Sequence, residues 1–335
     1  MSKIPRKINQ ITSNPFSLSF DHHRYHTWNY HLQEHFGSKV FKVSLNAGFT
    51  CPNIDGKVAI GGCTFCSVKG SGDFAGNPAE DLKRQFETIK TNMHKKWPDV
   101  TQYIAYFQAF SNTYAPLHIL KEKFEAILEI PGVVGLAIAT RPDCLPDDIV
   151  EYLAELNKRT YLWVELGLQS MHDSTGRKIN RGHDLAIFEA GFMKLKAHNI
   201  QTCVHIINGL PGETTEMMQQ SAQYVADIGA DSIKIHLLHI LKNTAMAKLY
   251  DNNNLALMDK DIYCNLVASQ LEVLPQNCII QRLTGDGGID DLIGPLWSLK
   301  KFDVMNTIDK VLLARDSYQG KYYNQQRQIM LEGAK

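Results

Sequence analysis

Short apolar runs alternate with amphipathic segments from about residue 40 to residue 240. The runs are rich in β-branched and aromatic residues, which predicts strands, and the segments between them repeat apolar residues at helical spacing. The predicted strands are Val40–Leu45, Tyr103–Phe107, Val133–Ala139, Tyr161–Leu168, Thr202–Ile207 and Ser232–Leu238. The predicted helices are Pro78–Lys96, Leu117–Leu128, Asp147–Leu156, Leu185–His198 and Glu216–Ile228.

This alternation defines the expected fold class. Apolar strands separated by helices form βα units, whose parallel sheet is buried on both faces. Six such units without a dinucleotide-binding glycine fingerprint predict an α/β fold, namely a partial (β/α)6 TIM-type barrel. An open, doubly wound sheet is the alternative.

The pattern changes at both ends of this core barrel, which spans residues 40–240. Residues 1–39 form a polar, His-rich N-terminal extension, which we expect to pack its aromatic side chains on the body. Such a stretch is also a candidate for binding a metal or a nucleic acid. Residues 241–335 form a C-terminal extension and a candidate substrate-binding region, with predicted elements at Asp259–Leu274 (helix), Cys278–Leu283 (strand) and Asn306–Asp316 (helix).

Composition and charge restrict the class of protein without identifying it. The 335 residues are 44% hydrophobic, enough for a large core, and no apolar run approaches the roughly 20 residues that span a bilayer. The N-terminus lacks the apolar segment of a secretory signal, so we expect a cytoplasmic protein with no membrane partner. The net charge is zero, but residues 1–50 carry six Lys and Arg against two acids, and residues 296–335 carry seven against four. Basic ends suit an anionic partner, and equally the solvated surface of an enzyme.

Three of the seven cysteines form one motif. The loop after the first predicted strand reads CPNIDGKVAIGGCTFC, a C-x11-C-x2-C spacing that groups Cys51, Cys63 and Cys66. Three thiolates are one short of the closed tetrahedron of structural zinc, but they suit a [4Fe–4S] cluster with one iron open to a small molecule. Zinc with a distant histidine as fourth ligand is the alternative. An odd number of cysteines argues against a disulfide scaffold and fits a reducing compartment.

Polar residues gather where the predicted strands end. In a TIM-type barrel, functional residues lie in the loops at the C-terminal ends of the strands. An acid inside a buried strand, as Glu165 is, is costly unless it is paired or functional. Together with the cysteine loop, these residues predict one pocket. They are Gln108, Glu165, Gln169, Arg181, Asn208, Gly209, Lys234, His236 and His239.

The motifs CPNIDG, GGCTFC, ATRPD, ELGLQS, NRGH and GLPGE resemble those of radical S-adenosylmethionine (SAM) enzymes, in particular the branch that contains the Elongator catalytic subunit. The resemblance covers about residues 40–240. The x11 gap departs from the common superfamily spacing C-x3-C-x2-C, as long gaps do in that branch. The whole chain, including GPLWSLKK at Gly294–Lys301, is most similar to a compact bacterial Elongator-like family without an acetyltransferase domain.

The resemblance implies a partial (β/α)6 barrel in which Cys51, Cys63 and Cys66 hold a [4Fe–4S] cluster. The open iron chelates SAM, and one-electron reduction yields a 5′-deoxyadenosyl radical that abstracts hydrogen from the substrate. For this family the implied substrate is a tRNA wobble uridine, whose C5 carboxymethylaminomethyl group becomes aminomethyl. An electron donor such as flavodoxin or ferredoxin is implied as a partner.

Positions in the motifs imply the residues that bind SAM. Gln108 follows the second strand, where the superfamily contacts the SAM amino group. Gln169 and Arg181 match residues that hold the ribose and the carboxylate. The turn that contains Asn208 and Gly209 is expected near the adenine.

The resemblance is less definite about the reaction itself. Glu165 is expected to orient SAM or the substrate. Lys234 and His236, together with His239, lie where substrate contacts and proton transfer are expected. We take Glu165, Lys234 and His236 as the catalytic candidates.

Other functions remain open at this stage. The same radical chemistry on a small molecule or a protein is one of them, and tRNA affinity that falls with salt would separate it from a tRNA enzyme. In the tRNA case the basic ends and the aromatic N-terminal segment would contact phosphates and bases. A zinc-stabilised, non-enzymatic binding module is the other alternative, and it predicts a colourless protein that does not bind SAM.

Overall fold

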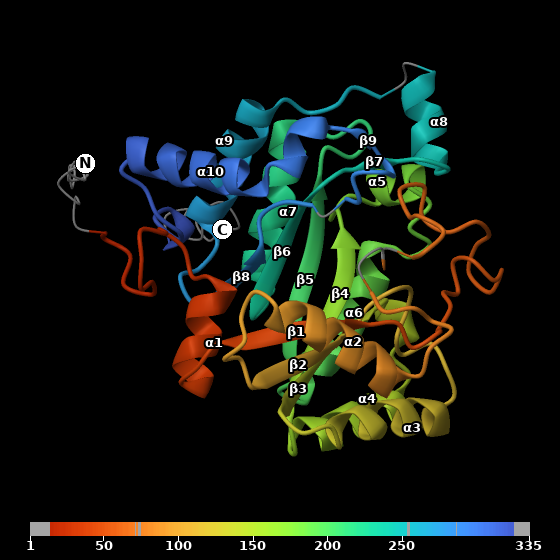
Figure 1. Cartoon of the computed structure of the whole chain (residues 1–335). Helices are drawn as coiled ribbons and strands as arrows, with labels where there is room; N and C mark the ends of the chain where they lie inside the picture. Colours follow the sequence, from red (N-terminus) through yellow and green to blue (C-terminus); the bar gives the residue numbers. More distant parts are fainter. Residues whose placement is uncertain (1–13, 71, 73–74, 253–254, 286, 325–335) are drawn as a thin grey trace.

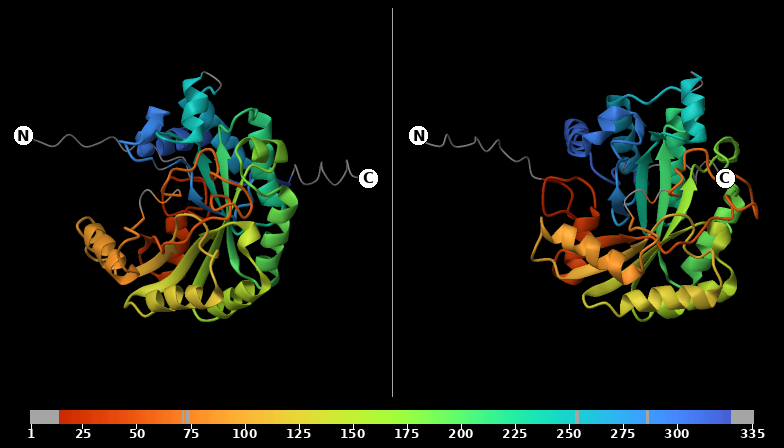
Figure 2. Two further views of the ribbon diagram at one scale, coloured as in Figure 1. Left: turned by 90° about the vertical axis from the view of Figure 1, so that its right-hand side faces the viewer. Right: turned by 45° about the vertical axis from the view of Figure 1, so that its right-hand side comes forward.

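The computed structural model describes residues 14–70, 72, 75–252, 255–285 and 287–324. The main element of this described part is a parallel sheet of seven strands in the order β1-β2-β3-β4-β5-β6-β8. Figures 1 and 2 show this sheet curled into an open barrel with helices on its convex outer side. Its strands are β1 (Val40–Leu45), β2 (Gln102–Phe107), β3 (Val133–Thr140), β4 (Tyr161–Gln169), β5 (Gln201–Asn208), β6 (Ser232–Leu237) and β8 (Ile279–Arg282).

Helices connect the successive strands of the barrel. Several of them begin where an Asp or Thr side chain accepts a hydrogen bond from the backbone N–H three residues on, as at Asp81, Asp184 and Thr214, which stabilises the first turn. Their apolar faces, including Phe86, Phe124 and Leu153, are buried against the sheet. These helices are α2 (Leu82–His94), α3 (Leu117–Leu128), α4 (Asp147–Asn157), α6 (Leu185–Ala197), α7 (Thr215–Asp227) and α9 (Lys260–Val273).

Shorter elements complete the described part of the chain. α10 (Lys301–Ala314) packs on α9, and β7 (Ile240–Leu241) pairs antiparallel with β9 (Leu292–Gly294). α5 (Asp173–Lys178) and α8 (Ala245–Asp251) lie near the loops at the C-terminal ends of the strands (Figure 1). No helix among the described residues is long and apolar enough to cross a membrane.

Helix α1 (Trp28–Phe36) closes the N-terminal end of the barrel. Leu32 is buried in a cluster with Ile104 and Trp163, and the ring of Trp28 meets Trp163 edge-on at 5.2 Å. The segment before α1 also contacts the last strand, because the backbone N–H of Ile280 donates to the carbonyl of His26 at 2.8 Å. The expectation that the N-terminal extension packs its aromatic residues on the body is confirmed for this part of it.

The predicted fold class is confirmed, and each predicted strand of the core lies within one residue of its predicted ends. The sheet differs in one respect: the strand predicted at Cys278–Leu283 is β8, which pairs with β6 and extends the barrel beyond six strands. A segment assigned to the C-terminal extension therefore contributes to the same sheet. The sequence did not predict α1, α5 or α8, because these are short helices whose order depends on contacts with the rest of the fold.

Candidate functional site

A cavity of about 960 Å³ occupies the barrel interior and reaches the loops at the C-terminal ends of the strands. Most of the residues singled out in the sequence line it, although they come from elements far apart in the chain. Asn208 and Gly209 are not among its lining residues. Those that line it are Cys51, Cys63, Cys66, Gln108, Glu165, Gln169, Arg181, Lys234, His236 and His239.

The cysteine loop is held in place by hydrogen bonds to the segment around Asn180. The backbone N–H of Thr64 donates to the carbonyl of Ile179 at 3.0 Å. The side chain of Asn180 donates to the carbonyl of Gly62 at 2.7 Å. In return, the buried amide of Asn53 donates to the carbonyl of Asn180 at 2.6 Å and lies 3.5 Å from the Cys63 sulfur. The loop is therefore tied to a segment that follows β4.

The spacing of the three thiols bears on the two metal centres that the sequence left open. Thiolates around one zinc ion lie about 3.8 Å apart, because the Zn–S bond is about 2.3 Å. Among the described residues, the groups of side chains whose ligand atoms all lie within 4.8 Å of one another are His22–His23–Asp309 and Glu165–Cys203–His205. Neither contains a cysteine of the loop, so its thiols are spread more widely than a single zinc ion requires.

Burial favours the protonated thiol of Cys63 in the cysteine loop. Burial raises the pKa of the Cys63 thiol to about 12, and the neighbouring thiols of Cys66 and Cys51 add to the effect. A thiol must lose its proton to bind a metal, so binding at this loop releases protons. The three loop cysteines are half-buried and line the cavity, and together they provide the donor set that a [4Fe–4S] cluster with one open iron needs.

Arg181 is buried, and its guanidinium is occupied by the protein itself. Its Nη1 donates to the carbonyls of Leu168 at 2.8 Å and Ser170 at 2.6 Å. Its Nε donates to the carbonyl of His183 at 2.8 Å, and Nη2 donates to Asp173 at 3.0 Å. Arg181 therefore fastens the end of β4 to the loop before α6. The contact with the SAM carboxylate expected from the sequence stays a prediction.

The turns after β2 and β4 have unusual backbone conformations at the cavity wall. Ala109, Phe110 and Gln169 have φ values of 78°, 58° and 65°, in the left-handed region that residues other than glycine seldom adopt. The side chain of Asn112 holds the first turn, because it donates to the carbonyls of Ala109 at 3.1 Å and Ala139 at 2.8 Å. Such strain is typical of functional sites. These turns place Gln108 and Gln169 on the cavity.

Asn208 lies at the end of β5 but faces away from the cavity. Its neighbour Ile207 lines the cavity, and successive side chains on a strand point to opposite faces. The amide of Asn208 forms reciprocal hydrogen bonds with Gln270 of α9, at 2.8 and 2.9 Å. The structure thus gives Asn208 a packing role between β5 and α9, and its contact with a cofactor stays a prediction, as does that of Gly209.

Glu165 lies at the centre of a buried polar cluster in the cavity. Its carboxylate accepts hydrogen bonds from Lys42 at 2.8 Å, from the Tyr106 hydroxyl at 2.8 Å, from His205 at 2.9 Å, and from Lys234. We call these five residues the Glu165 cluster. Lys42 also donates to the side-chain oxygen of Gln281 on β8 at 2.6 Å. The cluster thus joins β1, β2, β4, β5, β6 and β8.

Burial and charge set the protonation of the Glu165 cluster. Burial favours a neutral Glu165, but the ammonium groups of Lys234 and Lys42 hold its pKa well below the ordinary value. Burial lowers the pKa of Lys234 to about 8, although Glu165 opposes this shift. Burial also lowers the pKa of His205 to about 4, so its imidazole is neutral at pH 7. The cluster therefore holds two amines and one carboxylate.

Lys42 and Tyr106 were not among the residues singled out in the sequence. Lys42 had the same signal as Glu165, an ionisable residue inside an apolar predicted strand. Tyr106 resembled ordinary core aromatics, and only its contacts with Glu165 and Lys234 distinguish it.

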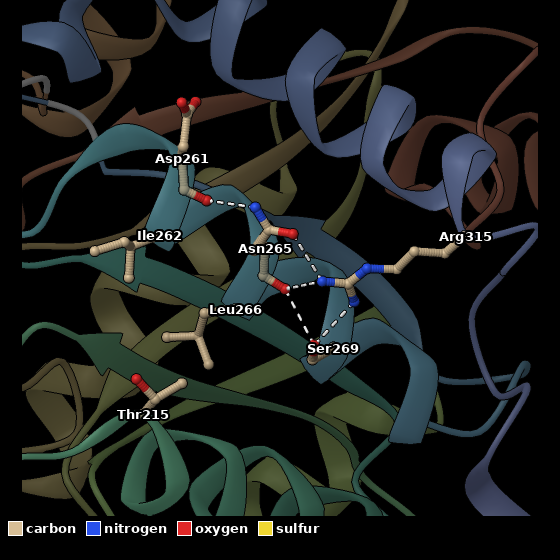
Figure 3. Close-up of a pocket in the computed structure, with 7 residues that line it drawn as sticks. All are labelled: Thr215, Asp261, Ile262, Asn265, Leu266, Ser269 and Arg315. Atoms are coloured by element: carbon tan, nitrogen blue, oxygen red, sulfur yellow. Dashed lines mark hydrogen bonds between the residues drawn. The ribbon is translucent and has the colours of Figure 1, made fainter.

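A second hollow, of about 360 Å³, lies between the start of α7, α9 and the end of α10 (Figure 3). Arg315 turns onto α9 there and donates to the side-chain oxygen of Asn265 at 2.8 Å and to Ser269 at 3.0 Å. It also donates to Glu272 at 3.3 Å. Because these hydrogen bonds join Arg315 to α9, we assign it a role in packing the end of α10 against α9.

Comparison with known protein families gives two matches along the chain. The model of the radical SAM superfamily matches residues 59–225, and the model of the Radical_SAM C-terminal domain matches residues 230–313. A Bacillus subtilis (strain 168) protein of uncharacterized function, YtqA, is 57% identical over 313 residues, which cover 93% of this chain and 97% of YtqA.

More distant similarities extend to named enzymes and to a solved structure. The tRNA-2-methylthio-N(6)-dimethylallyladenosine synthase of Clostridium botulinum (strain Okra / Type B1) is 25% identical over 193 residues, covering 56% of this chain and 42% of the synthase. The archaeal Methanocaldococcus infernus Elp3 superposes with a TM-score of 0.64 at 14% identity, covering 85% of this chain and 67% of Elp3. At that identity the superposition shows a shared fold.

Proposed function

This chain belongs to the radical SAM superfamily, and from that membership we propose that it modifies tRNA, converting the carboxymethylaminomethyl group at C5 of a wobble uridine to aminomethyl. Members of the superfamily are enzymes that use a [4Fe–4S] cluster and SAM. When bound, these cofactors supply hydrogen-atom abstraction.

One observation supports this proposal above the others: the three loop cysteines and the Glu165 cluster line the same cavity. We assign Cys51, Cys63 and Cys66 to the [4Fe–4S] cluster. Gln108, Gln169 and Arg181 surround the same end of the cavity, where they would contact SAM. The protein would thereby shield the reactive end from water while the barrel interior receives the substrate.

The inner part of the cavity is suited to a polar group of the substrate. Glu165, Lys234 and His236 lie there, and we assign them to substrate contact. The Nε2 atom of His236 is buried and has no hydrogen-bond partner in the part of the chain that the structure describes, so it is available to a ligand. Burial holds the pKa of His236 well below its ordinary value, which makes it a neutral donor or acceptor.

Two considerations support tRNA as the substrate. One relative that covers about half of this chain is, by name, a tRNA-modifying synthase. The positive charge at both ends of the sequence suits a polyanion. Several aromatic residues of the N-terminal segment, such as Tyr25 and Trp28, are used in packing, so any RNA contact in that region would come from exposed side chains such as Phe20. A flavodoxin or ferredoxin would supply the electron.

The proposal is tested in two stages. The chain is reconstituted with iron and sulfide without oxygen, reduced and given SAM, and 5′-deoxyadenosine is measured. We expect product from the wild type and from Cys278→Ala, whose cysteine is buried outside the loop, and none from Cys63→Ala. The protein is then incubated with tRNA that carries carboxymethylaminomethyluridine, and the nucleosides are analysed by mass spectrometry. A colourless zinc protein without product would refute the enzyme, and an unchanged nucleoside in an active preparation would refute the substrate.

A further inference from the structure

Among the described residues, the Glu165 cluster holds more positive than negative charge. Two amines, Lys42 and Lys234, share one carboxylate. Glu165 is the only acidic residue among the described residues that line the cavity. Tyr106 does not supply a second anion, because burial and Glu165 hold its pKa well above the ordinary value.

A buried excess cation is unfavourable unless an anion balances it. We infer that this part of the cavity is a binding subsite for the carboxylate group of a ligand, held between the ammonium groups of Lys42 and Lys234. The inference rests on the proposed function in one respect only: that function identifies the ligand group as the carboxymethylamino arm of the modified uridine. The chemistry of the subsite itself follows from the side chains.

The hydrogen-bond capacity of the two lysines matches a carboxylate. An ammonium group has three N–H donors. Lys42 uses two of them, on Glu165 and Gln281, and Lys234 uses two, on Glu165 and the Tyr106 hydroxyl at 3.1 Å. One donor of each lysine is not used by the described residues, which suits the two oxygens of a single carboxylate. Arg282 of β8 lines the same cavity and adds a further positive charge, which also favours an anionic ligand.

The subsite is deep in the barrel, apart from the cysteine loop. Glu165 precedes Gln169 on β4 by four residues, which corresponds to about 13 Å along a strand. The Lys42 ammonium group lies 4.6 Å from the centre of the Trp28 ring, so an aromatic side chain of α1 borders the subsite. A substrate arm that reaches Lys42 would therefore leave the cofactor end of the cavity free.

The test uses small probes and the cluster-free full-length chain, with no SAM and no tRNA. N-methylglycine carries the secondary amine and carboxylate of the proposed arm, and N-methylethanolamine has the same amine but no carboxylate. Binding is followed by tryptophan fluorescence, since Trp28 lies next to Lys42, and by calorimetry. We expect saturable binding of N-methylglycine only. Equal binding of the two compounds, or none, would overturn the inference.

Variants locate the binding within the cavity. Lys42→Met should weaken N-methylglycine binding about 10- to 100-fold, the usual effect of losing a charge-assisted hydrogen bond, whereas Lys42→Arg should retain it. Lys39→Met, which removes a half-buried lysine directly before the same strand, and Gln169→Ala, at the cofactor end, should leave binding unchanged. A loss confined to Gln169→Ala would place the probe in the SAM site and overturn the inference.

Glu165→Gln gives a test in the opposite direction. This substitution removes the carboxylate that both lysines now bind, so the affinity for N-methylglycine should rise. The added compound should also raise the melting temperature of this variant more than that of the wild type. A purely structural ion pair would not respond in this way. Probe binding without conversion of tRNA would refute the proposed function and retain the subsite. Conversion by Lys42→Met at an unchanged KM would retain the function and overturn the subsite.

Discussion

The conformation of the segment after β4 depends on Arg181, and replacing it with lysine tests that dependence. The guanidinium donates to three backbone carbonyls and to Asp173 while its side chain is 1% exposed. Arg181→Lys keeps the positive charge. It replaces a planar fork of five N–H donors by three donors that radiate from one atom at the end of a flexible stem.

The expected magnitude follows from the number of acceptors that lose their donor. A single Nζ atom cannot reach acceptors on opposite sides of the planar group, so we expect two of the four contacts to survive. Each buried acceptor left without a partner costs about 1–3 kcal/mol. The two lost contacts therefore predict that the free energy of unfolding falls by about 2–6 kcal/mol.

Urea unfolding of the cluster-free chain measures this change through the midpoint at a constant m value. Arg177→Lys is the matched control, because Arg177 lies on the same short helix α5 with its side chain exposed, and it should change stability by less than about 0.5 kcal/mol. A loss below about 1 kcal/mol in Arg181→Lys would refute the reasoning, since it would mean that water replaces the guanidinium at these carbonyls.

Three further predictions concern the cysteine loop, helix α1 at the N-terminal end of the barrel, and stability in acid. Gly182→Ala should unfold more easily and retain less iron than Gly229→Ala: both glycines have positive φ, but a Cβ at Gly182 would lie 2.3 Å from the Asn53 side-chain oxygen and one at Gly229 would meet nothing within 4 Å. Equal urea midpoints and iron contents would contradict this. Leu32→Ala should lower the free energy of unfolding by about 2–5 kcal/mol, measured by urea unfolding; a change near zero would mean that α1 docks without it. Burial lowers the pKa of His31 from 6.5 to about 4, so the unfolded chain binds a proton that the folded chain does not, and stability should fall as the pH drops from 6.5 to 4. His31→Gln should reduce that slope in urea titrations, and an unaltered slope would argue against the assignment.

The parts of the fold that the sequence predicted are those with local signals. Strands of a parallel sheet are buried on both faces, so each appears as an apolar run, and Val40–Leu45 matches β1 at both ends. The cysteine loop was recognisable because its ligands are close in sequence. Asn208 is a different case: its position at a strand end predicted a place near the cofactor, and the side chain hydrogen-bonds to Gln270 of α9, because successive side chains on β5 point to opposite faces.

The parts that could not be predicted depend on how the sheet curls. Lys42 on β1 and Glu165 on β4 are 123 residues apart in sequence, and they meet only because the barrel brings their strands around one interior. Helix α1 is a mixture of polar and aromatic residues without a clear periodicity. Its position depends on the contacts that Trp28 and Leu32 make with the strands of the barrel. Neither feature has a counterpart in a local pattern.

The contact between Lys42 and Gln281 has a consequence for how the chain is made. Strands β1 to β6 pair with their neighbours in sequence, so each of these βα units can dock on the previous one as it leaves the ribosome. Lys42, however, meets its partner Gln281 only after another 239 residues have been translated, a delay of about 12–50 s at 5–20 residues per second. The loop that carries the three cysteines is complete early in this interval. A nascent chain stopped before residue 279 would thus carry every proposed metal ligand and lack β8, the last wall of the cavity.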